Sequence, residues 1–358
     1  MNLVNDIKAI IRAGVSAPSG DNLQPWRFVV VDNVIEVHAL TLGDEIKFGG
    51  YYALFITQGA LIENLVIAAD HYGYDSVVSL FPDKQNRLHV ASINLRFDPI
   101  DRGVDLFRFF DKRLTDRHGY SPERLSSDIK KALQEAGEEM VEGSRLVFVE
   151  DKQDIFTIAK CVVGQIEVLF SHKTLHELFF KSLRWSGADA HGTADGLDVR
   201  TLHLNIFKKF FFHYMLRSWV FVKILSKLYI HKVAALMESV RYKEAGAYCA
   251  LIKSGEQIND EEAVAAGRAM ERFWLMATRL GLRVQPTFAV FLIKHSFDFD
   301  LFDYSEAQKE LIDMKSKTME SICGVGEGET LLWLTRIGYP KYKEQYQTYR
   351  KNPEVVFK

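Results

Sequence analysis

The 358-residue sequence contains only three cysteines, Cys161, Cys249 and Cys323, and they lie far apart in the chain. Three scattered thiols cannot build a disulfide framework or a cysteine-based metal site, which indicates a reducing compartment. The eleven histidines show no HExxH or comparable spacing, so we predict no metal. The N-terminus has no uninterrupted apolar core of a secretory signal, and we expect a cytoplasmic location with no transmembrane segment.

Charge of one sign is also lacking, because the formal net charge is only −2. A near-neutral chain gives no reason to expect nucleic acid as a partner. No dinucleotide-binding fingerprint is present either: the glycine-rich stretch 324–328 follows no strand and opens no helix, so it reads as a turn. No low-complexity tract or flexible linker occurs, and the length suffices for two modules around one substantial core.

The most informative stretch that is present is the turn at residues 17–26, with the sequence APSGDNLQPW. It combines two prolines, small residues, the amide side chains of Asn22 and Gln24, and the large aromatic anchor Trp26. Proline makes the backbone rigid, and amides offer both donors and acceptors. These properties suit a site that holds a flat heterocycle with polar edges.

A second candidate is the segment around Arg113, Thr115 and Arg117. Two guanidiniums that flank a hydroxyl suit a phosphate dianion, because arginine offers planar paired donors and keeps its charge. The pattern alone is not specific, since similar spacings are common on solvated faces.

Short matches along the chain indicate an internal repeat. The triplet at 6–8 opens a helix that ends at Ala-Gly, and the same triplet at 128–130 opens another that ends in the same way. Further on, GALIE at 59–63 and GRAME at 267–271 each lead a helix with a terminal glycine. Two matches in the same order favour duplication of an ancestral unit.

The turn at 17–26 resembles the flavin-binding loop of the FMN-dependent nitroreductase family, and Arg113-x-Thr115-x-Arg117 resembles the family's segment for the FMN phosphate and pyrimidine edge. In that family the loop reaches across a dimer interface. Here the loop lies in the first copy, whereas the arginine segment lies in the second. This order resembles the tandem, Acg-like or ThiF-associated branch, in which one chain mimics the family's homodimer.

The two copies differ in a complementary way. The first has no arginine segment before its helix, and the second has residues 138–144 where another such loop would stand. The resemblance therefore implies one flavin site per chain and an α+β, three-layer nitroreductase-like sandwich, internally duplicated. We expect the first copy at 1–100 and the second at 101–358, with a helical insertion at about 170–245.

Two further segments join the expected site. Arg336, in RIGYP, resembles the family's C-terminal arginine at the phosphate, although a plain strand end with a Gly-Pro turn explains it as well. Gln285 and Pro286 resemble the segment that passes the flavin ring, or form an ordinary helix-to-strand connection. The expected FMN-binding residues are Ser19, Asn22, Gln24, Trp26, Arg113, Thr115, Arg117, Gln285, Pro286 and Arg336.

Residues 199–237 are rich in aromatic and basic side chains and contain no acidic residue. Three interpretations stay open: a lid over the flavin, a surface for anionic lipid, or packed helices whose cations face water.

The expected elements follow from hydrophobic periodicity and turn residues. For the second copy, Ser121 with Pro122 predicts a helix N-terminus. The helices are expected at 3–13, 58–72, 122–136, 153–169 and 261–280, and the strands at 28–39 (a hairpin), 77–80, 88–95, 145–150, 248–252, 284–293 and 330–336.

The resemblance implies an FMN oxidoreductase that transfers a hydride to or from a small conjugated organic substrate, with NAD(P)H as electron donor. The flavin performs that chemistry, so no catalytic acid or base is assigned. An FMN-sequestering or sensing protein and a biosynthetic dehydrogenase are the alternatives. We expect a monomer that acts as a pseudo-dimer, or a homo-oligomer.

Overall fold

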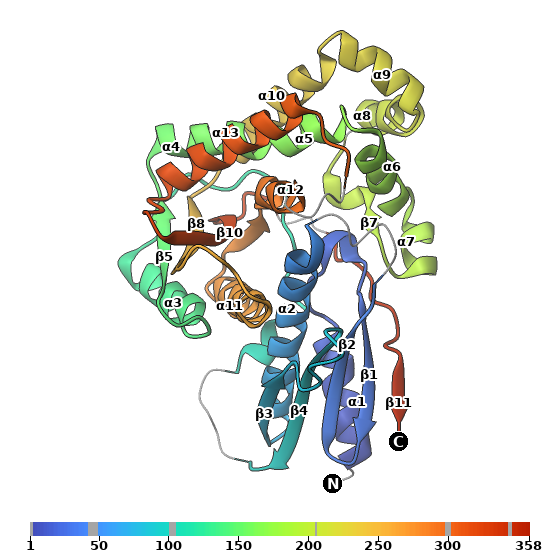
Figure 1. Cartoon of the computed structure of the whole chain (residues 1–358), viewed down its shortest axis with the longest axis vertical. Coiled ribbons are helices and arrows are strands. Elements are labelled where there is room, and N and C mark those ends of the chain that lie inside the picture. The colour runs from blue at the N-terminus through green and yellow to red at the C-terminus, as the bar shows by residue number, and fades with distance from the viewer. Residues whose placement is uncertain (1–2, 42–48, 100–104, 205, 298–301, 343–345) are drawn as a thin grey trace.

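The computed structural model describes residues 3–41, 49–99, 105–204, 206–297, 302–342 and 346–358, and has the mixed α+β architecture expected from the sequence. Figure 1 shows two β-sheets joined by a pair of helices between them. The boundary expected between residues 100 and 101 lies outside the described residues.

The first sheet is built from the N-terminal part of the chain. Its elements are α1 (Leu3–Gly14), β1 (Trp26–Val31), β2 (Val34–Ala39), α2 (Gly50–His71), β3 (Tyr74–Leu80) and β4 (His89–Phe97). The strand order is β1-β2-β4-β3, and all three pairings are antiparallel. Helix α1 buries Ile7, Ile10 and Ile11, which recur at helical spacing, and so covers one face of this unit.

The second sheet repeats this plan. Its elements are α3 (Ser127–Glu138), β5 (Ser144–Val149), β8 (Ala247–Ser254), α11 (Asp260–Arg279), β9 (Arg283–Pro286) and β10 (Glu329–Gly338). The order β5-β8-β10-β9 matches that of the first sheet strand by strand, and the pairings are again antiparallel. The tight β1–β2 hairpin corresponds to a long excursion between β5 and β8.

Helices α2 and α11 cross at the two glycines that head the matched segments. A Cβ atom on Gly59 would lie 2.0 Å from the carbonyl oxygen of Val264, and one on Gly267 would lie 2.0 Å from that of Ile56. Each glycine thus faces the carbonyl oxygen of the residue that lies three positions before the other glycine. This reciprocity is the contact pattern of a two-fold symmetric interface.

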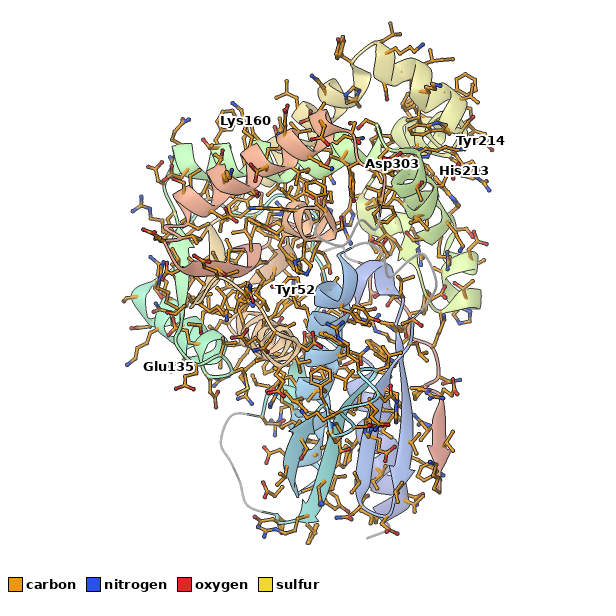
Figure 2. The ribbon with its side chains drawn as sticks, viewed as in Figure 1. Tyr52, Glu135, Lys160, His213, Tyr214 and Asp303 are labelled. Carbon is orange, nitrogen blue, oxygen red and sulfur yellow. The ribbon has the colours of Figure 1, made fainter. Side chains whose placement is uncertain are left out.

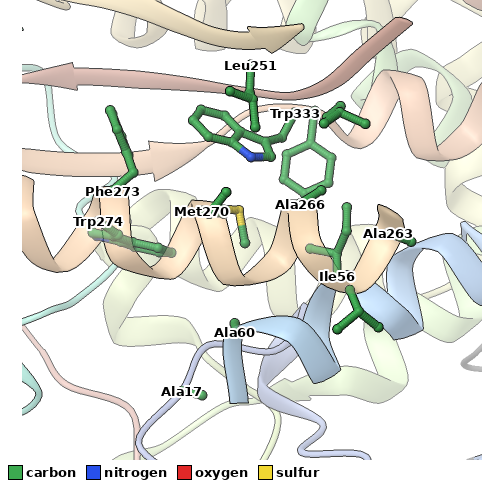
Figure 3. Packing of buried hydrophobic residues seen from close by; sticks show 14 of the residues in the cluster. Ala17, Ile56, Ala60, Leu251, Ala263, Ala266, Met270, Phe273, Trp274 and Trp333 are labelled. Carbon is green, nitrogen blue, oxygen red and sulfur yellow. The ribbon is translucent and has the colours of Figure 1, made fainter. Parts of the chain in front are cut away.

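The hydrophobic core is continuous across the crossing. Figure 3 shows Leu251 and Trp333 of the second sheet on one side of α11, and Ile56 and Ala60 of α2 on the other. Among the described residues, α2 is the single unbroken helix long and apolar enough to cross a membrane, and 83% of that stretch is buried within the protein. The bent pair formed by 152–169 and 173–182 passes the same test together, with an angle of 99°.

The C-terminal segment returns to the first sheet. Strand β11 (Val355–Phe357) pairs in parallel with β1, outside the β1–β2 hairpin. The first copy expected at 1–100 therefore does not include β11, although this strand extends the sheet of that copy.

The excursion between β5 and β8 is mainly helical. It contains α4 (Lys152–Val162), α5 (Gly164–Leu169), α6 (Lys173–Ser182), the short pair β6 (Leu183–Arg184) and β7 (Leu197–Asp198), α7 (Gly187–Thr193), α8 (Ile206–Phe211), a π-helix (Phe212–Leu216), α9 (Trp219–Lys227) and α10 (Ile230–Tyr242). A small separate core lies inside it. Figure 1 shows α8 and α9 at the end of the molecule farthest from the first sheet.

Some expected elements are corrected. The predicted strand at 284–293 is wrong beyond Pro286, because α12 (Ala289–Phe297) follows; a short apolar run does not separate strand from buried helix. Helix α3 begins at Ser127, where Ser126 accepts a hydrogen bond from the Ile129 amide, and not at Ser121.

Three further differences concern helices. The predicted helix at 153–169 breaks at Val163, α2 begins at Gly50 and not at 58, and α13 (Glu306–Ile322) was not expected. Helix α13 packs with α4 on the face of the second sheet opposite α3 and α11, which gives this half its three layers (Figure 1).

Candidate cofactor site

The turn at 17–26 is held rigidly by local hydrogen bonds. Asp21, Asn22 and Gln24 have positive φ angles of 46°, 57° and 56°, so the chain doubles back tightly. Ser19 Oγ accepts a bond of 3.0 Å from the Gln24 amide, and Trp26 is buried at the start of β1. Short polar side chains tolerate this backbone region better than most, which explains two of the three residues.

The two amide side chains of the turn are engaged by other parts of the chain. Gln24 Nε2 donates to Ala194 O (2.8 Å), and its Oε1 accepts from the Lys351 amide (2.8 Å). Asn22 Nδ2 donates to Tyr349 O (3.0 Å). The C-terminal segment therefore lies directly on the turn.

Arg113 joins the second copy to the first at this place. Its Nη2 donates to the carbonyl of Ser16 (2.7 Å), one residue before the turn. Its Nε lies 3.1 Å from Glu271 Oε1, and its guanidinium lies over the Trp274 ring at 4.7 Å. The turn and the arginine segment, far apart in sequence, thus meet as the sequence predicts.

A further arginine, Arg350, completes this cluster. Its Nη2 donates to Ser16 O (3.1 Å) and its Nη1 to Asn22 Oδ1 (2.9 Å). Burial, with a smaller contribution from Arg113, lowers the pKa of Arg350 to about 9, and Glu271 opposes that change. No motif in the sequence pointed to this residue.

Arg117 and Thr115 lie further along the same segment. Thr115 forms a parallel bridge with Val284, which fixes the segment beside β9. Arg117 Nη1 donates to Thr201 Oγ1 (3.2 Å). Burial lowers the pKa of Arg117, whereas Tyr242 and the turn residue Asp21 raise it. The carboxylate of Asp21 therefore lies close enough to this guanidinium to affect its pKa.

Arg336 and Gln285 form a buried hydrogen-bond network. The fully buried Arg336 donates through Nε to Gln285 Oε1 (2.7 Å), through Nη1 to Arg241 O (2.9 Å) and through Nη2 to His118 O (2.6 Å). Pro286 pairs with Thr335 on β10. Most donors of Arg336 therefore already have protein acceptors, and its contact with phosphate stays a prediction.

Among the described residues, two groups of side chains bring metal-ligand atoms together from segments that are not close in the sequence. Glu36, His38 and His89 form one, and Asp116, His118 and His203 form the other, with their ligand atoms within 4.8 Å of one another. In the second group, burial lowers the pKa of His203 to about 4, and His118 and the guanidiniums of Arg241 and Arg117 add to this effect. Those guanidiniums disfavour a further cation there.

The residues around Ser16 fit an anionic group. Among the described residues, Arg113 Nε, Arg350 Nε and Glu271 Oε2 are buried atoms without a well-formed hydrogen bond. Two guanidiniums beside one carboxyl leave a local excess of positive charge, and buried donors without acceptors are costly. A phosphate would supply acceptors for both arginines.

Comparisons with known proteins support the resemblance drawn from the sequence. No protein-family model matches the chain. An uncharacterized protein of Mycobacterium tuberculosis strain CDC 1551 is 24% identical over 298 residues, which cover 81% of this chain and 40% of that protein. A second protein of that strain, provisionally named as an NAD(P)H nitroreductase, is 29% identical over 119 residues, covering 32% of this chain and 34% of its own length.

The matched regions thus span less than half the length of either curated relative. Solved structures with similarity include an FMN-dependent nitroreductase of Clostridium difficile R20291, at 12% identity and a TM-score of 0.35, which covers 67% of this chain and 90% of its own. Another is a nitroreductase with bound FMN from Desulfitobacterium hafniense DCB-2, at 12% identity and a TM-score of 0.37, which covers 69% and 94%. The chain resembles nitroreductases, and membership of the tandem branch stays a prediction.

Proposed function

We propose that this chain binds one FMN and acts as an oxidoreductase of the nitroreductase type. The observation that carries the proposal is the direct contact between Arg113 of the second copy and Ser16, beside the turn of the first copy (2.7 Å). A flavin site assembled from two related units requires this encounter. One relative is named as an NAD(P)H nitroreductase, which agrees with the proposal.

Arg113 and Arg350 are the residues we assign to the FMN phosphate, with Thr115 beside them. Both guanidiniums converge on Ser16 O and retain buried donors without well-formed bonds. Ser19, Asn22 and Gln24 would contact the isoalloxazine edge from the turn, which Trp26 anchors in the core. The present bonds of Asn22 and Gln24 to the C-terminal segment would have to be shared or exchanged.

Arg117, Gln285 and Pro286 form the pyrimidine side in this proposal, and Arg336 lies behind Gln285 towards the phosphate. When bound, FMN supplies hydride transfer between NAD(P)H and a small conjugated organic substrate. The positive charge of Arg117 beside the pyrimidine edge would favour reduction, and Arg336 holds Gln285 in place through its Nε. No side chain is assigned as an acid or base, and we place the protein in the cytoplasm.

One site per chain follows from the proposed duplication. The two sheets have the same strand order, and the central helices cross reciprocally at Gly59 and Gly267. The connection from α1 to β1, residues 15–25, holds the turn. Its counterpart from α3 to β5 is only residues 139–143, too short to form a second turn of this kind.

The first test removes the proposed phosphate ligands. Arg113→Ala and Arg350→Ala should each weaken FMN binding at least about tenfold, because a charge-assisted hydrogen bond contributes roughly 1.5–3 kcal/mol. Flavin fluorescence titration of the purified full chain measures this. Arg108→Ala is the matched control, since that exposed side chain pairs only with the nearby Asp105 among the described contacts. Unchanged affinity in both variants would remove the two arginines from the site.

A second candidate function is flavin storage or sensing. It is favoured by the C-terminal segment, which covers the turn through the bonds of Asn22 and Gln24 to residues 349 and 351. Anaerobic addition of NADH or NADPH to the holoprotein separates the two functions. Bleaching of the flavin absorbance supports the oxidoreductase, and a persistent yellow colour supports storage.

A further inference from the structure

The helices α8 to α10 carry an unusual surface of large apolar side chains that face solvent. Along α8 and the π-helix, Phe207, Phe210 and Tyr214 have exposures of 84%, 64% and 61%. On α9 and at its end, Val220, Ile224 and Leu228 are exposed by 66%, 52% and 65%. Both sets recur at helical spacing, so each helix presents one apolar stripe outward. These six residues define the outer face.

This exposure is not the result of a missing inner core. The opposite sides of the same helices pack inward, where Phe212, Trp219 and Val222 join Phe170 and Phe180 in the small second core. The helices are therefore apolar on both sides, with only one side covered. Large apolar side chains exposed in this way indicate contact with a protein or a membrane.

The charge of the segment selects between those partners. Residues 199–237 contain seven lysines and arginines and no acidic residue. Among them Arg217, Lys223, Lys227 and Lys232 are exposed on or beside the helices of the outer face. A second copy docked through the same face would bring like charges together, which disfavours self-association.

We propose that the outer face of α8 and α9 docks on an anionic lipid bilayer. Exposed Phe, Tyr, Leu and Ile side chains would enter the headgroup boundary, while the lysines would meet lipid phosphates. Figure 1 shows α8 and α9 projecting at one end of the molecule, and Figure 2 shows Tyr214 at its rim, so a flat bilayer can reach this face. No transmembrane helix is needed for such attachment.

The segment from α8 to α10 contacts the candidate cofactor site at both of its ends. Before α8, Thr201 bonds Arg117; at the end of α10, the Arg241 carbonyl accepts from Arg336. Attachment to a bilayer would therefore orient that site relative to the lipid. The lipid-binding proposal itself does not depend on flavin binding.

Vesicle co-sedimentation of the purified full chain tests the proposal. We expect binding to vesicles of phosphatidylcholine with about 30% phosphatidylglycerol, weaker binding to pure phosphatidylcholine, and a loss of binding near 0.5 M salt. Two variants separate the contributions: Phe207→Ser/Phe210→Ser/Tyr214→Ser and Lys223→Glu/Lys227→Glu. Each should lower the partition coefficient at least about tenfold.

Val77→Ser is the matched control, because Val77 is 62% exposed on β3, outside the outer face. Circular dichroism melting should show all variants folded, since only exposed side chains change. No binding to either vesicle, or equal binding by wild type and both variants, would overturn the proposal. So would a concentration-dependent dimer that the triple serine variant abolishes, because that outcome assigns the face to a second copy.

Discussion

At the scale of single residues, Glu271 is the carboxyl group of the candidate site whose pKa changes on folding. It is fully buried on α11, within 3.1 Å of Arg113 Nε. Burial raises its pKa to about 7, against the opposing effects of Arg113 and Arg350. The pair is compensated only partly, because the desolvation cost exceeds what the arginines return.

This gives stability a defined pH dependence. The folded pKa of about 7 lies above the ordinary value of 4.5, so the native state holds a proton between those values that the unfolded chain has released. The contribution of Glu271 to stability is therefore full below pH 4.5 and is lost as pH rises towards 7. Glu271→Gln should remove this dependence. Between pH 5 and pH 8, the free energy of unfolding of the variant should rise relative to that of the wild type by up to about 3 kcal/mol.

Urea unfolding of the two proteins at pH 5, 6, 7 and 8 measures the effect. Parallel pH profiles would show that Glu271 is ionised throughout this range in the native state. A bound phosphate should widen the difference, because a nearby anion raises the pKa of a carboxyl further.

At the scale of elements, the two halves of the molecule pack against each other where α2 and α11 cross. A side chain at Gly59 or Gly267 would lie 2.0 Å from a backbone carbonyl, and backbone cannot rotate away as a flexible side chain can. Gly59→Ala and Gly267→Ala should each lower the free energy of unfolding by about 1–3 kcal/mol or more, because the helices must separate.

Gly192→Ala is the control for helix propensity. Gly192 lies in α7, and its added Cβ would meet nothing within 4 Å. Alanine there should be neutral or stabilise by up to about 1 kcal/mol. Denaturant melts of the three variants compare the two situations. Equal stability of Gly59→Ala and Gly192→Ala would mean that the crossing is looser than the contacts indicate.

At the scale of the whole molecule, two sheets share the same strand order, and the proposed flavin site draws its residues from both copies. Only the α1–β1 connection is long enough for the turn, and only the second copy carries Arg113, Thr115 and Arg117. We therefore expect saturation at one FMN per chain. Visible flavin absorbance against protein concentration in the reconstituted holoprotein measures the ratio, and two flavins per chain would contradict the composite-site account.

The sequence by itself determined the local features. Hydrophobic spacing predicted α1, α11 and both halves of the first hairpin within a few residues, because helix and strand patterns depend on neighbouring side chains. The match of GALIE with GRAME indicated the two helices that cross at their glycines. The order of the turn and the arginine segment predicted that parts of two copies meet.

Only the tertiary structure decided which distant groups share the site. Arg350 enters it because β11 pairs with β1 and carries the C-terminal segment across the turn. Arg336 is held by the carbonyls of residues 118 and 241, and the apolar stripes of α8 and α9 face outward because a separate small core lies behind them. Such contacts depend on how distant segments close upon one another, and no local pattern of residues encodes that closure.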